Sequence, residues 1–274
     1  MLPRINLQDF SRIVVLTGAG ISVASGLSTY RGPGGLWTRD GALSYATAEA
    51  VQSDPEGVWR FFSDRRQGIG RAQPNPAHLA LASAERLLKP GRSLTLITQN
   101  VDGLHRLAGS TNVIELHGSL WRTRCSANAC DFRRDEDLTR IDPACPTCPQ
   151  CGAWLRPDVV LFQEPLPGAA EYVAKRSLRD CDLFLAIGTS GTVSPASRFV
   201  RSALFAGART LYLNIEPLHE DDRLFHQQFI GPAETLLPAL LGTIRVRPDG
   251  SELGPGRNAS SRATRHHLTK GMIH

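Results

Sequence analysis

Residues 98–119 read TQNVDGLHRLAGSTNVIELHGS, and this stretch holds the features that decide the fold. A polar cluster at 99–102 directly follows a short apolar run at 93–97, and a second apolar run at 113–116 ends at His117. Buried strands that end in polar residues are typical of open parallel α/β sheets, which place their sites at the carboxyl ends of the strands. Histidine is suited to proton transfer near neutral pH, so His117 is a candidate general base. For this cluster alone, a capped loop with a core histidine is the alternative.

The composition bounds the class of protein. The chain has 274 residues, enough for one large domain and a smaller one, and is 41% hydrophobic and 21% charged. The apolar runs fall short of the ~20 residues that a membrane span needs, and the N-terminus lacks the apolar core of an export signal. We therefore expect a cytoplasmic protein that does not bind membranes.

The net charge of +5 belongs mostly to the end of the chain. Six Lys and Arg residues lie in 245–274 against two acidic residues, a net +4 that leaves +1 for the remaining chain. A basic Arg-, Gly- and Ser-rich tail is typical of a disordered, solvated segment. We therefore expect no specific nucleic-acid partner for the folded part.

A glycine-rich turn follows the first apolar run, 12–17 (RIVVLT). A strand that leads into Gly18-Ala19-Gly20 and then a helix start is a cradle for phosphate, because glycine allows close backbone approach and a helix N-terminus offers free N–H groups. The next glycine, Gly26, comes too late for the pattern G-x-G-x-x-G. An acidic residue at the end of a second strand ~20 residues on, which hydride-transfer enzymes use, is also missing. The turn predicts a nucleotide site without dehydrogenase chemistry.

Further elements extend this pattern. A Gly/Pro-rich loop at 29–37 is too long for a simple turn, so we expect it to close over a ligand, with a plain surface loop as the alternative. Two more apolar runs, 181–187 and 210–213, lead into small or polar residues and would reach the same edge if the sheet is parallel. Helices are expected at 42–67, 77–88, 198–208 and 236–241.

Five of the six cysteines lie between Cys125 and Cys151 in a hydrophilic segment. The pairs Cys125-x4-Cys130 and Cys148-x2-Cys151, 17 residues apart, match a four-thiolate zinc site better than a set of reduced core cysteines. Cys145 and Cys148 also form a C-x2-C pair, but the glycine after Cys151 favours the later pair. Four thiolates leave the metal no open position, so this zinc is expected to be structural.

In this order the motifs resemble those of sirtuins, the NAD-dependent protein lysine deacylases, over roughly residues 10–241. The residues that carry the resemblance, besides the cysteines, are Gly18-Ala19-Gly20-Ile21-Ser22, Gln99-Asn100-Val101-Asp102-Gly103-Leu104-His105, Leu116-His117-Gly118, Arg156-Pro157-Asp158-Val159-Val160, Gly188-Thr189-Ser190 and Asn214-Ile215-Glu216.

The resemblance implies an α/β fold with a Rossmann-like parallel sheet and a smaller zinc-binding and helical domain. The NAD-binding domain would comprise 10–38, 75–120 and 155–244. The small domain would comprise 39–74 and 121–154, and 245–274 would be the tail. NAD and acylated-lysine proteins or peptides would meet in the cleft between the two domains.

The resemblance also implies roles for individual residues. His117 would be the general base, and Cys125, Cys130, Cys148 and Cys151 would hold one zinc ion. The dinucleotide would be wrapped by Gly18, Ala19, Gly20, Ile21, Ser22, Tyr30, Arg31 and Trp37. Its nicotinamide end and ribose would be held by Gln99, Asn100, Val101 and Asp102. Its adenosine half would be held by Gly188, Thr189, Ser190, Asn214, Ile215, Glu216 and Ala233.

In the reaction that the resemblance implies, NAD is a consumed co-substrate. Nicotinamide leaves, and the acyl carbonyl oxygen attacks the ribose carbon to give an imidate. His117 then accepts a ribose hydroxyl proton so that this oxygen can attack in turn. The products are free lysine, nicotinamide and O-acyl-ADP-ribose. An NAD glycohydrolase or ADP-ribosyltransferase on the same fold is the alternative, and a zinc-ribbon nucleic-acid binder is a third hypothesis.

Within the family the chain is most similar to the group with a wide acyl pocket, in which a Tyr-x-x-Arg pair binds the carboxylate of succinyl-lysine. Ala46 and Arg65 match this group, whereas Phe62 stands at the tyrosine position. The loss of one charge-assisted hydrogen bond, about 1.5–3 kcal/mol, favours acetyl or longer neutral acyl groups. Tyr30 replaces the usual phenylalanine, and the run Leu161-Phe162-Gln163-Glu164 replaces a common Trp-Phe-Gly-Glu run, so the peptide preference is expected to differ.

Overall fold

The computed structural model describes residues 3–30, 35, 42–135, 144–190, 196–218, 222–242, 245–246 and 252–253. Its centre is a six-stranded sheet in the order β3-β2-β1-β7-β8-β9, in which every neighbouring pair is parallel. The strands are β1 (Arg12–Thr17), β2 (Ser93–Thr98), β3 (Val113–Glu115), β7 (Leu183–Ile187), β8 (Arg209–Asn214) and β9 (Gln227–Ile230). The prediction of a parallel α/β sheet is confirmed, and the polar strand ends lie on one edge.

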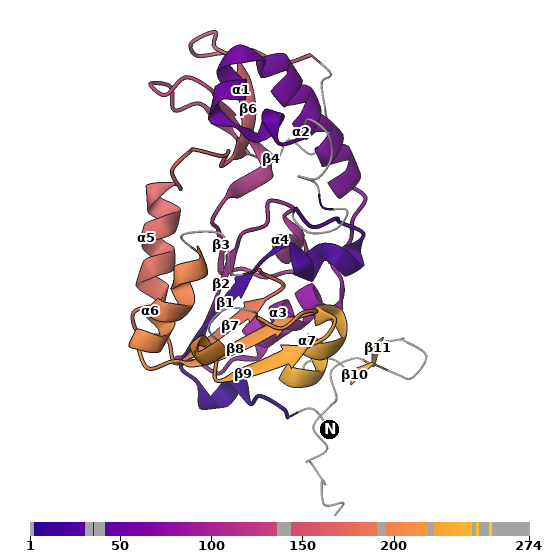
Figure 1. The fold of residues 1–274 in the computed structure, drawn as a ribbon, viewed down its shortest axis with the longest axis vertical. Coiled ribbons are helices and arrows are strands. Elements are labelled where there is room, and N and C mark those ends of the chain that lie inside the picture. The colour runs from indigo at the N-terminus through magenta and orange to yellow at the C-terminus, as the bar shows by residue number, and fades with distance from the viewer. Residues whose placement is uncertain are drawn as a thin grey trace, which may run out of the picture.

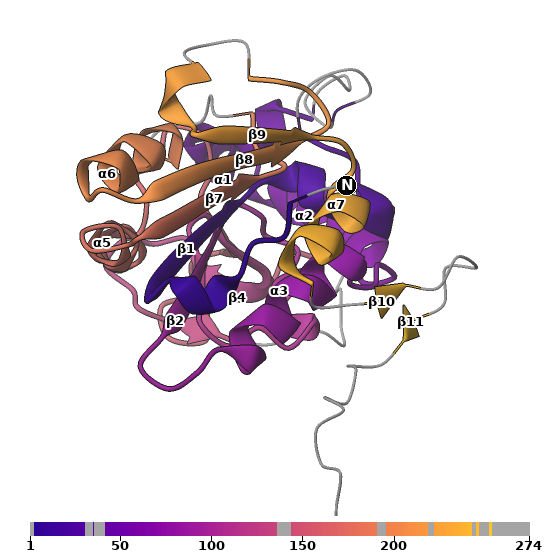
Figure 2. The same ribbon diagram turned by 90° about the horizontal axis from the view of Figure 1, so that it is seen from below.

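Alternate residues of β1 supply the two cores of this sheet. Ile13 and Val15 belong to one buried apolar cluster, and Val14 and Leu16 to another, because side chains along a strand point to opposite faces. Helices cover both faces, as Figures 1 and 2 show. The first face packs against α3 (Pro76–Leu87) and α7 (Ala233–Leu241), and the second against α5 (Gly168–Ser177) and α6 (Phe199–Phe205).

A second, antiparallel sheet has the order β5-β4-β6 and lies above the large one in Figure 1. Its strands are β4 (Gly118–Cys125), β5 (Arg133–Arg134) and β6 (Leu155–Val159). Two helices, α1 (Ala48–Ser53) and α2 (Pro55–Ile69), pack on it through a third apolar cluster. The predicted helical stretch at 42–67 is therefore divided, because Asp54 caps α2 through its bond from the Gly57 N–H (2.8 Å) and Pro55 occupies the first turn.

Buried Arg66 on α2 forms hydrogen bonds to β4. Its guanidinium donates to the carbonyl oxygens of Leu120 and Arg122 and to the Thr123 hydroxyl, the last two at 3.1 Å. It also stacks over the ring of Trp59, with 5.3 Å between the guanidinium carbon and the ring centroid. A charge removed from water is tolerated here because acceptors on the strand receive the N–H groups of its Nε and Nη2 atoms.

Several elements differ from the sequence-based prediction or were missed. The expected helix after the glycine turn is a 3-10 helix, η2 (Ala19–Ser25). The elements α4 (Leu104–Leu107) and β9 were not predicted, because they are short. In the tail, β10 (Arg245–Val246) pairs with β11 (Glu252–Leu253). The rest of the predicted disordered tail lies outside the described residues. Within the described part of the chain, the helices are too short or too polar to cross a membrane.

Candidate functional site

Three glycines bring the ends of β1 and β7 into backbone contact. The Gly20 N–H donates to the Gly188 carbonyl oxygen at 2.9 Å, and the Gly18 N–H donates to that of Ile187 at 3.0 Å. A Cβ on Gly20 would lie 2.7 Å from the Gly188 Cα, and one on Gly188, whose φ is +59°, would lie 2.4 Å from the Ile21 nitrogen. These glycines therefore serve protein packing as well as ligand approach, and two of the N–H groups expected to cradle phosphate are already bonded within the protein.

Side chains from three segments meet beside this turn in a directional hydrogen-bond chain. The His78 Nδ1 accepts from the Asn75 N–H (3.4 Å), which leaves Nε2 to carry the proton towards the Ser22 Oγ, also at 3.4 Å. Ser22 in turn donates to Asp102 Oδ2 at 2.8 Å and accepts from the Asn100 amide at 3.2 Å. Burial lowers the pKa of His78 to about 4, so its imidazole is neutral.

Asp102 lines a small pocket that is partly open to solvent. The described residues that line it are Ala19, Ser22, Leu27, Ser28, Tyr30, Arg65, Ile69, Asn100 and Asp102. Burial raises the pKa of Asp102, against the bonds from the Leu104 N–H (3.0 Å) and from Ser22. Each carboxylate oxygen receives one of these bonds and keeps a further lone pair for a polar ligand.

Tyr30 and Arg65 also line the pocket. The Arg65 guanidinium carbon lies 5.4 Å from the centroid of the Tyr30 ring. Burial raises the pKa of Tyr30, an effect that the charge of Arg65 opposes. Of the residues predicted to shape an acyl pocket, only Arg65 is among these lining residues. Ala46 and Phe62 are 3% and 5% exposed and pack in the apolar cluster between α2 and β4.

His117 lies in the two-residue connection between β3 and β4. Its Nδ1 is 2.8 Å from the Gln99 carbonyl oxygen, which can only accept, so Nδ1 carries the proton and Nε2 keeps its lone pair in the neutral ring. Burial lowers the pKa of His117, and the bond to Gln99 partly offsets this. The ring is therefore neutral near pH 7, with an acceptor nitrogen, as a general base requires.

Gln99 links this histidine to the strand ends on the other side of β1. Its side-chain amide donates to the Thr189 Oγ1 at 3.0 Å. Beyond it, the Asn214 amide donates to the hydroxyl of Tyr212 at 2.7 Å, and that hydroxyl donates to the Thr189 carbonyl oxygen at 3.2 Å. The structure thus brings together the predicted residues at the carboxyl ends of β2, β7 and β8.

Other predicted cofactor residues are placed differently. Ser190, Ile215 and Glu216 are exposed beyond the ends of their strands, and Ala233 is buried at the start of α7. Val101 is turned into the apolar cluster under α2. Arg31 and Trp37 lie outside the described residues.

Four cysteine sulfurs converge at the far end of β4. The Sγ atoms of Cys125, Cys130, Cys148 and Cys151 all lie within 4.8 Å of one another, with 3.5 Å between those of Cys125 and Cys151 and 3.7 Å between those of Cys130 and Cys148. Sulfurs placed about 2.3 Å from a tetrahedral zinc would be about 3.8 Å apart, so the cluster fits this ion. Cys145 stands aside, with its Sγ 3.4 Å from the Leu155 carbonyl oxygen. The prediction of Cys148 over Cys145 agrees with this geometry.

The sequence predicted no role for a group of buried polar residues that includes His78 and His105. The rings of His78 and His105 have their centroids 4.8 Å apart, and the His105 Nε2 is 3.0 Å from the Thr17 hydroxyl, which bonds to that of Thr98 at 2.9 Å. A weak signal existed, because polar residues end β1 and β2 and His78 lies in the first turn of an apolar helix. The pairing itself depends on segments far apart in the chain.

Comparison with known proteins gives matches over most of the chain. The model of the Sir2 family matches residues 18–195. A Thermus thermophilus protein called NAD-dependent protein deacylase is 47% identical over 215 residues, which are 78% of this chain and 83% of that protein. A solved Sir2 homologue–NAD complex is 37% identical with a TM-score of 0.76, and covers 86% of this chain and 90% of its own. A mutant Sir2 homologue in complex with 2′-O-acetyl-ADP-ribose is 37% identical with a TM-score of 0.75, and covers 85% and 92%.

Proposed function

We infer that this chain, which belongs to the Sir2 family, is an NAD-dependent deacylase that removes acetyl or other acyl groups from lysine side chains of proteins. The observation that carries the proposal is the tautomer of His117. A neutral imidazole bonded through Nδ1 to a backbone carbonyl oxygen offers Nε2 as a base at the edge where the strand ends converge.

The polar groups that line the pocket fit the nicotinamide end of NAD. A carboxamide donates through its NH2 group, and the wall offers the Asp102 carboxylate and the Asn100 side-chain oxygen as acceptors, because both Asn100 N–H groups already bond to Gly18 and Ser22. Thr189 and Asn214 follow Gln99 along the same sheet edge and would hold the more distant half of the dinucleotide. When bound, NAD would supply an electrophilic ribose carbon and a leaving nicotinamide.

The protein's own part in the chemistry is binding, orientation and one proton transfer. The apolar cluster formed by α2, β4 and β6, which includes Phe62 and Leu161, would lie against the acyl chain and keep water away from it. His117 Nε2 would accept the proton of a ribose hydroxyl, and the resulting imidazolium would be stabilised by the Gln99 carbonyl oxygen. The four thiolates would hold a zinc ion that fixes the end of β4 and takes no part in the reaction.

We propose the domain division that the sequence suggested. A large domain built on the six-stranded sheet would bind NAD, and a small one built on β4–β6, α1 and α2 would carry the zinc. The separate apolar clusters of the two sheets support it.

One assay separates the proposal from the alternative of an NAD glycohydrolase. Nicotinamide release is measured with NAD alone and with NAD plus an acetyl-lysine peptide, while the peptide mass is followed. We expect release that depends on the peptide and matches the loss of its acetyl group one to one. Release that is independent of the peptide would favour the glycohydrolase.

The acyl preference is tested with peptides that differ only in the acyl group. Phe62 lacks a hydroxyl, so Arg65 alone would meet a carboxylate, and acetyl-lysine is the expected better substrate. Phe62→Tyr should raise desuccinylation relative to deacetylation by about 10-fold, which corresponds to one charge-assisted hydrogen bond. An unchanged ratio would mean that residue 62 does not face the acyl group.

A further inference from the structure

The connection that carries His117 joins two different sheets. Glu115 ends β3 in the six-stranded sheet, and Gly118 begins β4 in the three-stranded one. Gly118 has φ +80°, and a Cβ there would lie 2.1 Å from the Asp158 carbonyl oxygen. The chain therefore turns a tight corner directly after His117.

An irregularity in β4 faces this corner. The ladder between β4 and β6 shifts register between Ser119 and Thr123, so residues 120–122 leave the regular pairing. The Leu120 N–H donates to the Val101 carbonyl oxygen at 3.0 Å, and the indole N–H of Trp121 donates to the Asp102 carbonyl oxygen at 2.7 Å. Bulges commonly redirect a side chain next to an active site, and this one directs residues 120–122 back towards the large sheet.

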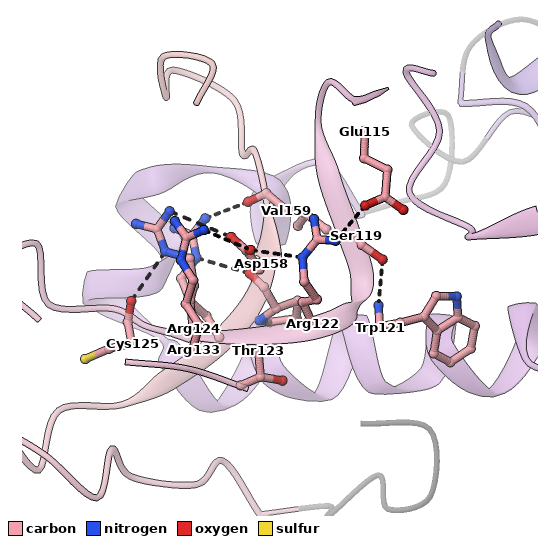
Figure 3. Close-up of polar contacts among 12 residues, drawn as sticks. Glu115, Ser119, Trp121, Arg122, Thr123, Arg124, Cys125, Arg133, Asp158 and Val159 are labelled. Carbon is pink, nitrogen blue, oxygen red and sulfur yellow. Dashed lines mark hydrogen bonds and ion pairs between the residues drawn. The ribbon is translucent and has the colours of Figure 1, made fainter. Parts of the chain in front are cut away.

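Arg122, the third residue of the bulge, connects both sheets. Its Nη1 lies 2.6 Å from Glu115 Oε2, and its Nε lies 3.3 Å from Asp158 Oδ2 on β6, as Figure 3 shows. The side chains of Glu115 and Asp158 are 9% and 11% exposed. Burial would lower the pKa of Arg122, but its two carboxylate partners outweigh this and the pKa is raised. The guanidinium is thus charged and held from both sides of the corner.

Each carboxylate keeps another cation when Arg122 is removed. Arg106 lies 3.4 Å from Glu115, and Arg124 and Arg133 lie 4.0 Å and 3.8 Å from Asp158. Loss of Arg122 therefore leaves neither carboxylate without a positive neighbour, and the fold should persist. What is lost is the one guanidinium among the described residues that touches both Glu115 and Asp158.

We propose that Arg122 is a positioning residue, which holds the corner between the two sheets through Glu115 and Asp158 and so aims the His117 ring into the site. Arg122 does not touch the reacting atoms. The inference rests on the proposed function, because it assumes that His117 acts as the base.

The test compares Arg122→Gln, Arg122→Lys and Arg106→Gln in the full chain. Arg106→Gln is the matched control, because Arg106 contacts the same Glu115 from the exposed side and does not reach Asp158. We expect Arg122→Gln to lower kcat about 10-fold or more, with KM for NAD and for the acyl-peptide within about 2-fold. Lysine can meet only one carboxylate well, so Arg122→Lys should recover part of the loss. Arg106→Gln should stay within about 2-fold of the unchanged protein.

A second measurement does not depend on turnover. The ring of His117 is titrated by NMR in the three variants and in the unchanged protein, with His117→Asn to assign its signal. A loosened corner admits water, so Arg122→Gln should move the pKa of His117 upwards, towards the ordinary histidine value, while Arg106→Gln leaves it in place. A variant that merely unfolds is recognised by its thermal transition.

The outcomes separate the two proposals. If the unchanged protein releases nicotinamide without an acyl-peptide, the proposed function fails, although the titration still tests the corner. If the unchanged protein deacylates but Arg122→Gln matches Arg106→Gln in kcat and in the His117 titration, the positioning role is overturned. A fall in kcat with no shift of the His117 titration also overturns it.

Discussion

The imidazole of His117 is bonded through Nδ1 to the backbone carbonyl oxygen of Gln99, 2.8 Å away. This contact joins the loop after β2 to the connection between β3 and β4, and the Gln99 side chain continues to Thr189 after β7. One residue therefore sets both the tautomer of the candidate base and the link to the next strand end.

Replacing the imidazole should remove the proton acceptor while the fold stays. We expect His117→Ala to lower kcat for deacylation by about 10²–10⁴-fold, the usual contribution of a positioned general base. Steady-state kinetics with an acetyl-lysine peptide measure this, and circular dichroism with thermal melting controls for folding. Turnover close to that of the unchanged protein would exclude His117 as the base.

The pH dependence of activity should follow the lowered pKa of His117. The base is active when neutral, and burial depresses its pKa below the ordinary 6.5. The acid limb of kcat/KM should therefore fall below pH 6.5, and activity should persist into mildly acid solution. Rates between pH 5 and 9 test this, and an acid limb at or above 6.5 would contradict it.

The two candidate cysteine pairings predict different metal contents. Cys148 lies in the four-sulfur cluster, whereas Cys145 contacts the Leu155 carbonyl oxygen. We expect Cys148→Ser to lose most of its zinc and its solubility, and Cys145→Ser to keep about one zinc ion per chain. Elemental analysis of both purified variants decides between them, and full zinc in Cys148→Ser would shift the assignment to Cys145.

The guanidinium that fastens α2 to β4 should matter for stability. Arg66→Met leaves acceptors on Leu120, Arg122 and Thr123 without their donor, and each unpaired buried group costs about 1–3 kcal/mol. We expect the free energy of unfolding to fall by about 3 kcal/mol or more in urea titrations. Arg60→Met, an exposed position on the same helix, is the control and should change it by less than about 0.5 kcal/mol.

Buried His78 should make stability depend on pH. Its pKa is about 4 in the folded state against 6.5 when unfolded, so the unfolded chain binds the extra proton between these values. The contribution of neutral His78 to the free energy of unfolding is therefore fully present above pH 6.5. It is lost as the pH falls towards 4, by an amount on the order of 3 kcal/mol. Urea unfolding at pH 7 and 5 should show a smaller loss in His78→Gln than in the unchanged protein. Equal losses would mean that His78 titrates normally in the folded state.

The local pattern of the chain determined most of the large sheet. Apolar runs at Arg12–Thr17, Ser93–Thr98 and Leu183–Ile187 are strands with polar ends, because burial on both faces of a parallel sheet demands continuous apolar runs. The spacing of Cys125, Cys130, Cys148 and Cys151 likewise predicted the four-sulfur cluster. Short or mixed segments such as β9 and α4 carry too weak a periodicity to be recognised.

Only the tertiary structure decided how distant groups meet. Three particulars depend on it: Arg65 lies over Tyr30 at the pocket, Phe62 packs away from it, and His78 reaches Asp102 through Ser22. The physical reason is that strand and helix patterns depend on neighbours within a few residues, whereas hydrogen bonds between buried side chains depend on how whole elements pack. The bridge from Glu115 through Arg122 to Asp158 joins two sheets across a bulge, and such a register shift leaves no periodic trace in the sequence.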